Sequence, residues 1–325
     1  MADVQVLEIA TDQLFDEERY LAANADVAVA TQHRLFASGW DHFDRHGRME
    51  GRKILRAGCL EAIATQRRSK YRRLEPCLEG SFSTSVGADL VVDALSDELR
   101  AHVAAHPTTN VSSLSYDEEA WQIIEDARGG LVLDLGAGFR DVYVDNVVHH
   151  EVARYPTTDV MGAGEKLPFK SNAFDAVLCF AVLEHVKYPW LVAQEMCRVL
   201  KPGGRLAVNA PFLAPLHGYP GHYYNMSASG LLAFFEDSIA VQKHFVPPAM
   251  GPIWALNWIV YLWGMGLTGP AKEEFLKLTV AELMQSPTVF LARPFVTELP
   301  EAKQFEIACG TYLIGQKKPA AAEAR

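Results

Sequence analysis

The sequence predicts an α/β fold built on a mostly parallel sheet with helices on both faces. From residue 131 onward, short apolar runs alternate with helical patterns, and this alternation is typical of parallel strands joined by helices. The 325 residues are 49% hydrophobic and 22% charged, which is ordinary for a globular chain long enough to bury a sizeable core. A glycine turn directly follows the first apolar run.

The expected elements follow one another at short intervals. They are strands over LVLDL (131–135), NVVHHEV (146–152) and FDAVLCFAV (174–182), a helix over 190–200, a KPGG turn, a strand over 205–212 and a last strand or strand pair over 305–318. The connection from 136 to 146 is short, because a crossover between parallel strands normally needs a dozen or more residues. We therefore expect the first helix to be stunted to one or two turns.

The chain divides by composition into several regions. We expect a helical N-terminal module over 1–80, a helical lead-in over 81–128, the main domain over 129–318 with a helical cover at 250–300, and a disordered tail at 319–325. The lead-in ends in a helix that Ser115 can cap, since Glu118 stands three positions later.

Charge and cysteine usage narrow the function classes. The net charge is −10 and the pI about 5.6, which disfavours nucleic-acid binding. The basic stretch 67–76 is interpreted as a solvated helix face or a linker. Five scattered cysteines and an acidic N-terminus without a signal-peptide pattern indicate a cytoplasmic protein. The apolar stretch 252–267 falls short of the ~20 residues of a membrane span, so we expect a buried or substrate-covering helix and no stable membrane insertion. Contact with a membrane surface is the alternative.

The glycine turn in LVLDLGAGFR indicates the kind of ligand. A dinucleotide fingerprint would need a third glycine at the position of Asp141. Asp134 would also lie unfavourably close to a pyrophosphate. S-adenosylmethionine (SAM) carries an ammonium and a sulfonium, and it suits this corner better. The alternative is a tight turn that holds no ligand.

The end of the second strand supplies a candidate partner for a ribose. A carboxylate there can accept hydrogen bonds from both ribose hydroxyls. Glu151 closes this strand, 17 residues after Asp134. Asp141 and Asp145 remain its rivals for the role.

Five blocks appear in a fixed order along the chain. They are LDLGAG (133–138), EKLPF (165–169), FDAV (174–177), VLEHV (182–186) and RVLKPGG (198–204). With these blocks the chain resembles class I SAM-dependent methyltransferases, of the branch called methyltransferase type 11. The resemblance covers roughly 131–245 plus the final strand. It implies a Rossmann-like, seven-stranded sheet, with the 250–300 helices inserted before the last strand, and SAM as cofactor.

The resemblance also implies a set of cofactor-binding residues. They are Asp134, Gly136 and Gly138 at the amino-acid end, Glu151 at the ribose, Gly164, Glu165, Lys166 and Leu167 around the adenine, and Cys179 and Phe180 beside the cofactor. Two positions depart from the family pattern. Arg140 stands where a third glycine is common, and Ala163 where an acid often pairs with the adenine amine. Adenine recognition then falls to backbone groups around Gly164 and Glu165, or to the Glu165 side chain.

The acceptor side is expected in the loop 211–227. Its candidate catalytic residues are His217, His222 and Tyr223, because an alcohol or phenol must lose a proton when it is methylated. The alternative is that the histidines cap turns and the tyrosine anchors the core. His185 is expected to hold local structure. His149 and His150 are strand neighbours that face opposite sides, and we expect no metal site.

Residues 15–52 contain the pattern Y-L-x-x-N-x-D-V…H-F-x-x-x-G-x-x-E-G-R. With this pattern they resemble small helical modules attached to bacterial glycosyltransferases and other surface-polysaccharide enzymes. The expected core is Tyr20, Leu21, Val27, Trp40 and Phe43. His42 and His46 stand four residues apart and are interpreted as satisfied histidines, not as metal ligands. We expect this module to serve docking or homo-oligomerisation.

Three hypotheses follow. The first is a SAM-dependent methyltransferase that acts on a small-molecule, saccharide or lipid-linked acceptor, with O-methylation favoured. The second is a catalytically inactive SAM-fold protein that works as a binding or scaffold module. The third is an NAD(P)-dependent oxidoreductase, which Asp141 and the lack of a catalytic Tyr-x-x-x-Lys pair disfavour.

Overall fold

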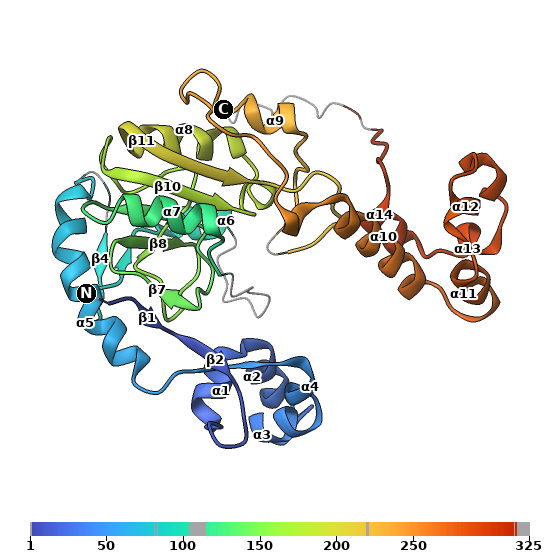
Figure 1. The fold of residues 1–325 in the computed structure, drawn as a ribbon, viewed down its shortest axis with the longest axis horizontal. Helices are drawn as coiled ribbons and strands as arrows, with labels where there is room; N and C mark the ends of the chain where they lie inside the picture. The colour runs from blue at the N-terminus through green and yellow to red at the C-terminus, as the bar shows by residue number, and fades with distance from the viewer. Residues whose placement is uncertain are drawn as a thin grey trace, which may run out of the picture. The chain divides into compact units, whose positions relative to one another are not determined.

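The structure is a computed structural model that describes residues 2–80, 82, 84–103, 115–218, 221–314 and 316 (Figure 1). The chain divides into two compact units. The first comprises Met1–Phe212 with Gly218–Lys243, and the second Leu213–His217 with His244–Arg325. The expected disordered tail at 319–325 lies outside the described residues.

The first unit begins with a helical region that carries short strands. Its elements are β1 (Val4–Gln5), β2 (Leu7–Ile9), α1 (Glu17–Ala23), α2 (Ala25–Gln32), α3 (Gly39–His42), a π-helical turn (Phe43–Gly47), α4 (Arg48–Glu50), β3 (Lys53–Leu55) and α5 (Cys59–Leu74). Tyr20, Val27 and Phe43 are buried here, as predicted. Trp40 is 41% exposed, so its prediction as a core residue was wrong: its ring packs edge-on against Phe15 at the surface.

The predicted seven-stranded, mostly parallel sheet is confirmed. Its strands are β4 (Ser85–Val86), β5 (Val92–Asp93), β6 (Val132–Leu135), β8 (Val147–Glu151), β9 (Val160–Met161), β10 (Phe174–Phe180) and β11 (Leu200–Asn209). They are ordered β11-β10-β6-β8-β9-β5-β4. Only the pairing of β4 with β5 is antiparallel.

Helices cover both faces of this sheet, as predicted. On one face, Val192 and Met196 of α8 (Pro189–Val199) share an apolar cluster with Leu133 of β6. On the other, Ile123 of α7 (Glu118–Asp126) shares a second cluster with Val132. The side chain that caps α7 belongs to Asp117, which accepts from the N–H of Ala120. The prediction of Ser115 as the cap was wrong, and its hydroxyl instead donates to Asp141. The short helix α6 (Asp97–Val103) precedes α7.

The expected last strand is absent from the described residues. Helix α14 (Glu301–Ile307) occupies the start of the segment, and residues 308–314 and 316 form no regular element. Pro300 precedes the helix and Glu301 stands in its first turn, and both features favour a helix start. The sheet therefore reaches seven strands because β4 and β5, from the lead-in, extend its other edge.

The first connection contains no helix, so the expected stunted helix was wrong. Residues 136–146 instead include β7 (Val142–Tyr143), which pairs antiparallel with β1. A path of this length is too short for a crossover helix, and the N-terminal strand satisfies its backbone. No helix N-terminus therefore stands behind the glycine turn.

Helix α5 carries the basic stretch, and it is not the solvated face or linker that was expected. Arg67 and Lys70 are buried and contact Asp159, at Nε–Oδ1 3.2 Å and Nζ–Oδ2 2.8 Å. Arg73 pairs with Asp145 on the same side of the helix. The spacing of three residues places these cations on one face, and that face packs on the sheet domain.

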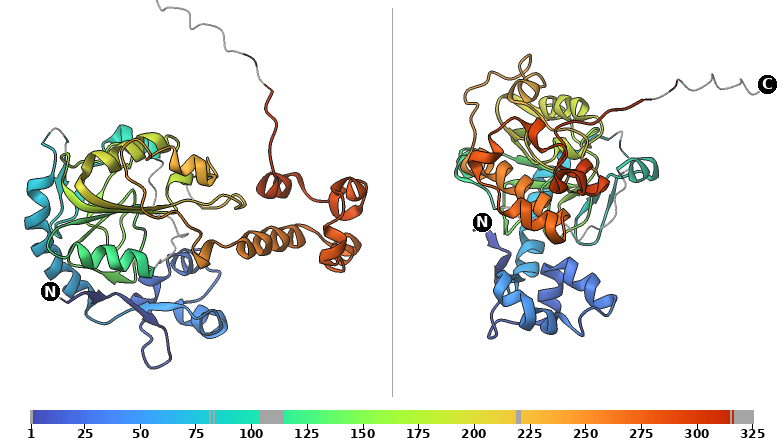
Figure 2. Two further views of the ribbon diagram at one scale, coloured as in Figure 1. Left: turned by 45° about the horizontal axis from the view of Figure 1, so that its top comes forward. Right: turned by 90° about the vertical axis from the view of Figure 1, so that its right-hand side faces the viewer.

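The second unit is helical, as predicted for 250–300. It contains α10 (Pro252–Gly266), α11 (Gly269–Leu276), α12 (Val280–Leu283), α13 (Pro294–Thr297) and α14, coloured orange to red in Figure 2. Helix α10 is not buried, because Ile253 is 68% and Trp254 59% exposed, and the alternative of a substrate-covering helix stays a prediction. Within the second unit, the ring of Trp263 from α10 stacks on that of Phe275 from α11. Among the described residues, no helix is both long and apolar enough to cross a membrane.

Candidate cofactor and acceptor site

The order of the strands reverses its direction beside β6, which makes this place the topological switch point of the sheet. From β6 the chain moves to β8 and β9 on one side, and then returns to β10 and β11 on the other. Ligands of open parallel sheets bind beyond the carboxyl ends of the strands at such a switch point. Gly136 and Gly138 follow β6 there, and Phe180 ends β10.

The glycine turn is shaped for close approach and not for phosphates. Gly136 has φ +67°, and a Cβ there would lie 2.3 Å from Cγ2 of Val182. The N–H groups of Gly136 and Ala137 both donate to the carbonyl of His150 at 3.0 Å, and that of Gly138 donates to Glu151. A phosphate cradle needs free N–H groups and a helix N-terminus. This turn offers neither, which argues against a dinucleotide.

Glu151 stands at the end of β8 with both carboxylate oxygens directed by backbone groups. Oε2 accepts from the N–H of Gly138 at 2.9 Å and Oε1 from that of Val152 at 2.7 Å. Burial raises the pKa of Glu151, and these hydrogen bonds oppose the rise. Each oxygen can accept further hydrogen bonds, so the carboxylate fits the two hydroxyls of a ribose. Its rivals are engaged elsewhere: Asp145 with Arg73, and Asp141 with Ser115.

Asp134 is fully buried and paired with Arg140. Its Oδ2 lies 2.8 Å from Nε and its Oδ1 2.9 Å from Nη2, and the hydroxyl of Tyr116 donates to Oδ2 at 2.6 Å. Burial alone would raise the pKa of Asp134, but the charge and hydrogen bonds of Arg140 outweigh it and lower the pKa. The residue that replaces the third glycine therefore neutralises the acid of the turn.

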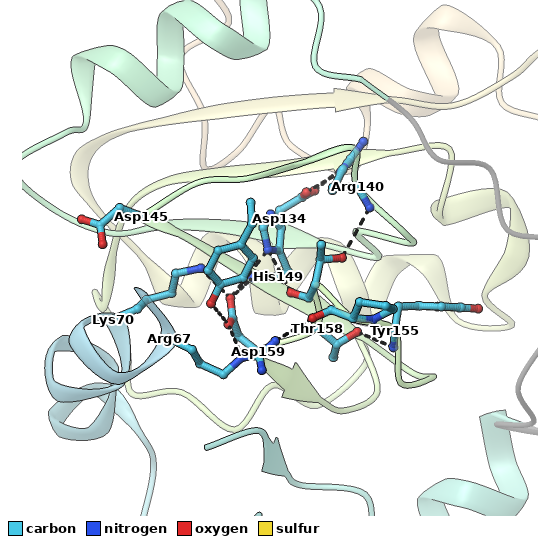
Figure 3. A network of polar contacts seen from close by, with 12 residues as sticks. Arg67, Lys70, Asp134, Arg140, Asp145, His149, Tyr155, Thr158 and Asp159 are labelled. Atoms are coloured by element: carbon cyan, nitrogen blue, oxygen red, sulfur yellow. Dashed lines mark hydrogen bonds and ion pairs between the residues drawn. The ribbon is translucent and has the colours of Figure 1, made fainter. Parts of the chain in front are cut away.

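A continuous polar network runs from this pair to helix α5 (Figure 3). The hydroxyl of Tyr116 lies 3.2 Å from Nε2 of His149, whose backbone N–H donates to Asp159 at 3.0 Å. Asp159 in turn binds Lys70 and Arg67. Tyr116 and Lys70 lie outside the five sequence blocks, so the sequence did not predict their part in this network. An arginine six residues after Asp134 was the one signal that the sequence contained.

The two strand histidines face opposite sides, as predicted. His149 points into the network, and its Nδ1 lies 3.1 Å from the carbonyl of Thr157. His150 lies against Phe169 on the other face, and its Nε2 has no hydrogen-bond partner in the part of the chain that the structure describes. Burial lowers the pKa of each to about 4.

The residues predicted around the adenine follow β9. Gly164 packs near Val192, and the ammonium of Lys166 lies over the ring of Phe82 at 5.1 Å. Leu167 is fully buried, and its N–H donates to Glu195 at 2.7 Å. Glu165 stands between Gly164 and Lys166 in the sequence, and its side chain is partly buried.

The residues predicted beside the cofactor end β10. Cys179 is fully buried, and Phe180 is half-buried against the α7 side of the sheet. Burial raises the pKa of the Cys179 thiol well above its usual value.

The expected acceptor loop is anchored on the turn after β10. The N–H of Tyr223 donates to the carbonyl of Glu184 at 2.7 Å, and Nδ1 of His185 lies 2.7 Å from the carbonyl of Gly221. The ring of His222 lies 5.6 Å from that of His185, and its Nε2 is 2.8 Å from Oδ1 of Asn225. The structural role expected of His185 agrees with its contact to the loop.

His217 belongs to the second unit. There its Nδ1 lies 2.8 Å from the carbonyl of Pro215 and its ring 5.0 Å from that of Trp258.

Comparison with known proteins identifies the family of the sheet domain. Residues 132–208 match the family model described as a methyltransferase domain. An uncharacterised methyltransferase of Mycobacteroides abscessus is 29% identical over 158 residues, which are 40% of this chain and 58% of that protein. One of Mycobacterium avium is 32% identical over 114 residues, 29% of this chain and 45% of that protein. The chain thus spans about half the length of these relatives.

Solved structures are similar over a comparable region. The YcgJ protein of Bacillus subtilis is 17% identical with a TM-score of 0.30, over 47% of this chain and 86% of that one. A phosphoethanolamine N-methyltransferase 2 of Haemonchus contortus, crystallised with S-adenosylhomocysteine, is 14% identical with a TM-score of 0.30. That match covers 57% of this chain and 48% of the other.

The strand order and the glycine turn at its switch point define a Rossmann-like domain. Together with the family match, they identify this domain as a class I SAM-dependent methyltransferase domain, with S-adenosylmethionine as its cofactor.

Proposed function

We propose that the chain is an enzyme that transfers a methyl group from SAM to a small-molecule or saccharide acceptor, with oxygen as the favoured target. The observation that carries this proposal is the link between Gly138 and Glu151, because it joins the close-approach turn to a carboxylate suited to a ribose. SAM supplies an electrophilic methyl group on a sulfonium.

The cofactor residues act mainly by binding and orientation. Glu151 accepts from the ribose hydroxyls, and Gly136 and Gly138 allow the amino-acid end to approach the backbone. Asp134 acts through Arg140, because its carboxylate is already neutralised. Gly164, Glu165, Lys166 and Leu167 flank the adenine, and Cys179 and Phe180 close the site at β10. Well-oriented reactants gain ~7–11 kcal/mol from positioning alone, so few other groups are required.

The acceptor contacts the part of the loop that carries His222 and Tyr223. His217, which belongs to the second unit, is a separate candidate for taking the proton. Tyr223 is 51% exposed, which leaves its ring available to an incoming molecule. The histidines are the loop's candidates for receiving a proton from a hydroxyl. Saccharide and lipid-linked acceptors both present such hydroxyls.

We also propose a cytoplasmic location, which agrees with five free cysteines. The N-terminal helices are proposed to serve docking or homo-oligomerisation.

The test is formation of S-adenosylhomocysteine. The protein is incubated with SAM and a panel of phenols and monosaccharides, and the product is quantified by mass spectrometry. Product that forms only when an acceptor is present supports the proposal. Its amount should fall in Glu151→Ala and stay unchanged in the control variant Glu236→Gln, because the side chain of Glu236 is exposed to solvent. No product with any acceptor contradicts it.

The neutralised Asp134 favours a second candidate, an inactive SAM-fold module. Its buried charge is already compensated by Arg140, which weakens its attraction for the ammonium of SAM. Binding of S-adenosylhomocysteine without turnover of any panel member would favour this reading over the first.

A further inference from the structure

The carboxyl group of Glu184 is buried without a hydrogen-bond partner. Its side chain is 0% exposed, and within the described ranges neither Oε1 nor Oε2 has a partner. The nearest charged or titratable nitrogen is Nε2 of His185, 3.9 Å from Oε1. Buried carboxylates that serve structure alone are normally paired or hydrogen-bonded, so this one lacks a structural explanation.

The turn that holds Glu184 touches both sides of the proposed reaction. Two residues earlier, Val182 packs against Gly136 of the glycine turn. On the other side, the N–H groups of Tyr223 and Tyr224 donate to the carbonyl of Glu184, at 2.7 and 3.4 Å. The acceptor loop is therefore anchored on the residue whose carboxyl group is unpaired.

The electrostatics of Glu184 suit proton transfer. Burial raises the pKa of Glu184 to about 7, and a general base works best when its pKa lies near the operating pH. Within the first unit, the titratable groups that face it are His185 from the same turn and Cys179 from β10. Cys179 stays a thiol, because burial raises its pKa. His185 is directed by its Nδ1 toward the carbonyl of Gly221.

We propose that Glu184 receives the proton of the acceptor hydroxyl during methyl transfer. This inference rests on the proposed function and narrows its substrates to neutral alcohols or phenols. The acceptor oxygen forms a bond to the methyl carbon while the carbon–sulfur bond breaks and its electron pair stays on sulfur. The O–H proton passes to a carboxylate oxygen of Glu184, which later releases it to solvent. His222 and Tyr223 then orient the acceptor and do not take its proton.

The first test measures the ionisation of Glu184 without any acceptor. A pKa raised above its unfolded value stabilises the fold below about pH 4.5, and this stabilisation is lost as the pH rises through about 7. Glu184→Gln removes the titration. The melting temperature of the variant minus that of the wild type should therefore rise between pH 5 and pH 8. A difference that stays constant over this range would overturn the proposal.

The second test separates a proton acceptor from a structural residue. Methyl transfer from SAM is compared for a simple phenol, which is neutral at pH 8, and for a nitrophenol that is already ionised. Glu184→Gln should lower the rate with the phenol by about 100-fold or more and change the rate with the nitrophenolate by less than about threefold. Glu184→Asp should recover part of the phenol rate.

The outcomes of this comparison are distinct. Equal losses on both acceptors, or no loss on either, overturn the role of Glu184 and leave the proposed function standing. Absence of product from the wild type with both probes overturns the inference, and absence with every member of the acceptor panel contradicts the proposed function as well. Glu236→Gln serves as the matched control, since this carboxylate is exposed and outside the site.

Discussion

Asp134 and Arg140 form a two-bond ion pair that solvent does not reach. The Nε–Oδ2 and Nη2–Oδ1 distances are 2.8 and 2.9 Å, and the residues are 0% and 1% exposed. The arginine stands at the position where the resemblance to methyltransferases leads us to expect a third glycine, and its guanidinium also lies 4.5 Å from the ring of Tyr116. The glycine turn after β6 is therefore held in place by the side chain of Arg140.

Removing one member of this pair should destabilise the fold strongly. Arg140→Met keeps most of the volume but leaves Asp134 buried without its counter-charge, which costs about 3–5 kcal/mol of unfolding free energy. Urea denaturation measures the change. In the double variant with Asp134→Asn the loss should be much smaller than the sum of the single losses. A single-variant loss within about 0.5 kcal/mol would mean that the pair is not formed.

The buried face of α5 should behave differently from its exposed face. Lys70→Met leaves Asp159 without its closest cation and should lower the unfolding free energy by about 2–4 kcal/mol, less than a full loss because Arg67 remains. Arg68→Met, on the exposed side of the same helix, should change it by about 0.5 kcal/mol or less. Equal effects of both substitutions would refute the buried contact.

A methyl group at the glycine turn should abolish cofactor binding. Gly136→Ala places a Cβ 2.3 Å from Cγ2 of Val182 at a φ of +67°, so the turn must move away from its ligand-binding position. Calorimetry with S-adenosylhomocysteine reports the loss, and circular dichroism checks the fold. Gly129→Ala is the matched control, because nothing lies within 4 Å of its Cβ position. Retained affinity in Gly136→Ala would place the ligand elsewhere.

Acid should destabilise the protein through its strand histidines. Burial, joined for His149 by the charge of Lys70, lowers the pKa of His149 and of His150 from about 6.5 to about 4. The unfolded chain binds protons that the folded chain does not, so stability is complete above pH 6.5 and is lost as the pH falls toward 4. The loss approaches about 3 kcal/mol for each histidine.

Denaturation at a series of pH values checks this prediction. His150→Leu should flatten the acid limb, because His150 has no hydrogen bond on its Nε2 among the described residues and leucine fits an apolar site. An acid limb of unchanged slope in that variant would show that His150 titrates normally.

The sheet core and the cofactor turn were predictable because their signals are local. Apolar runs mark β6, β8 and β10, and the glycines that need positive φ stand directly after β6. Glu151 could be placed beside the glycine turn because a strand end fixes its position. These features depend on neighbours within a few residues in the sequence.

Other features depend on partners that are distant in the sequence. Lys70 and Asp159 are separated by 89 residues, so the residues next to the basic stretch give no indication that its lysine is buried. The extended path of β7 is satisfied by β1 from the start of the chain. The unpaired carboxyl of Glu184 is likewise visible only once burial is known, although VLEHV is a clear motif.

Cofactor binding at Glu151 is tested most directly by calorimetric titration of S-adenosylhomocysteine into the wild type and Glu151→Ala, with NAD as a comparison ligand. The wild type should bind S-adenosylhomocysteine and not NAD. The variant should bind more weakly by about 1–3 kcal/mol, roughly 5- to 150-fold in Kd, for the lost charged hydrogen bonds. Tighter binding of NAD, or equal S-adenosylhomocysteine affinity in both proteins, would contradict cofactor binding at Glu151.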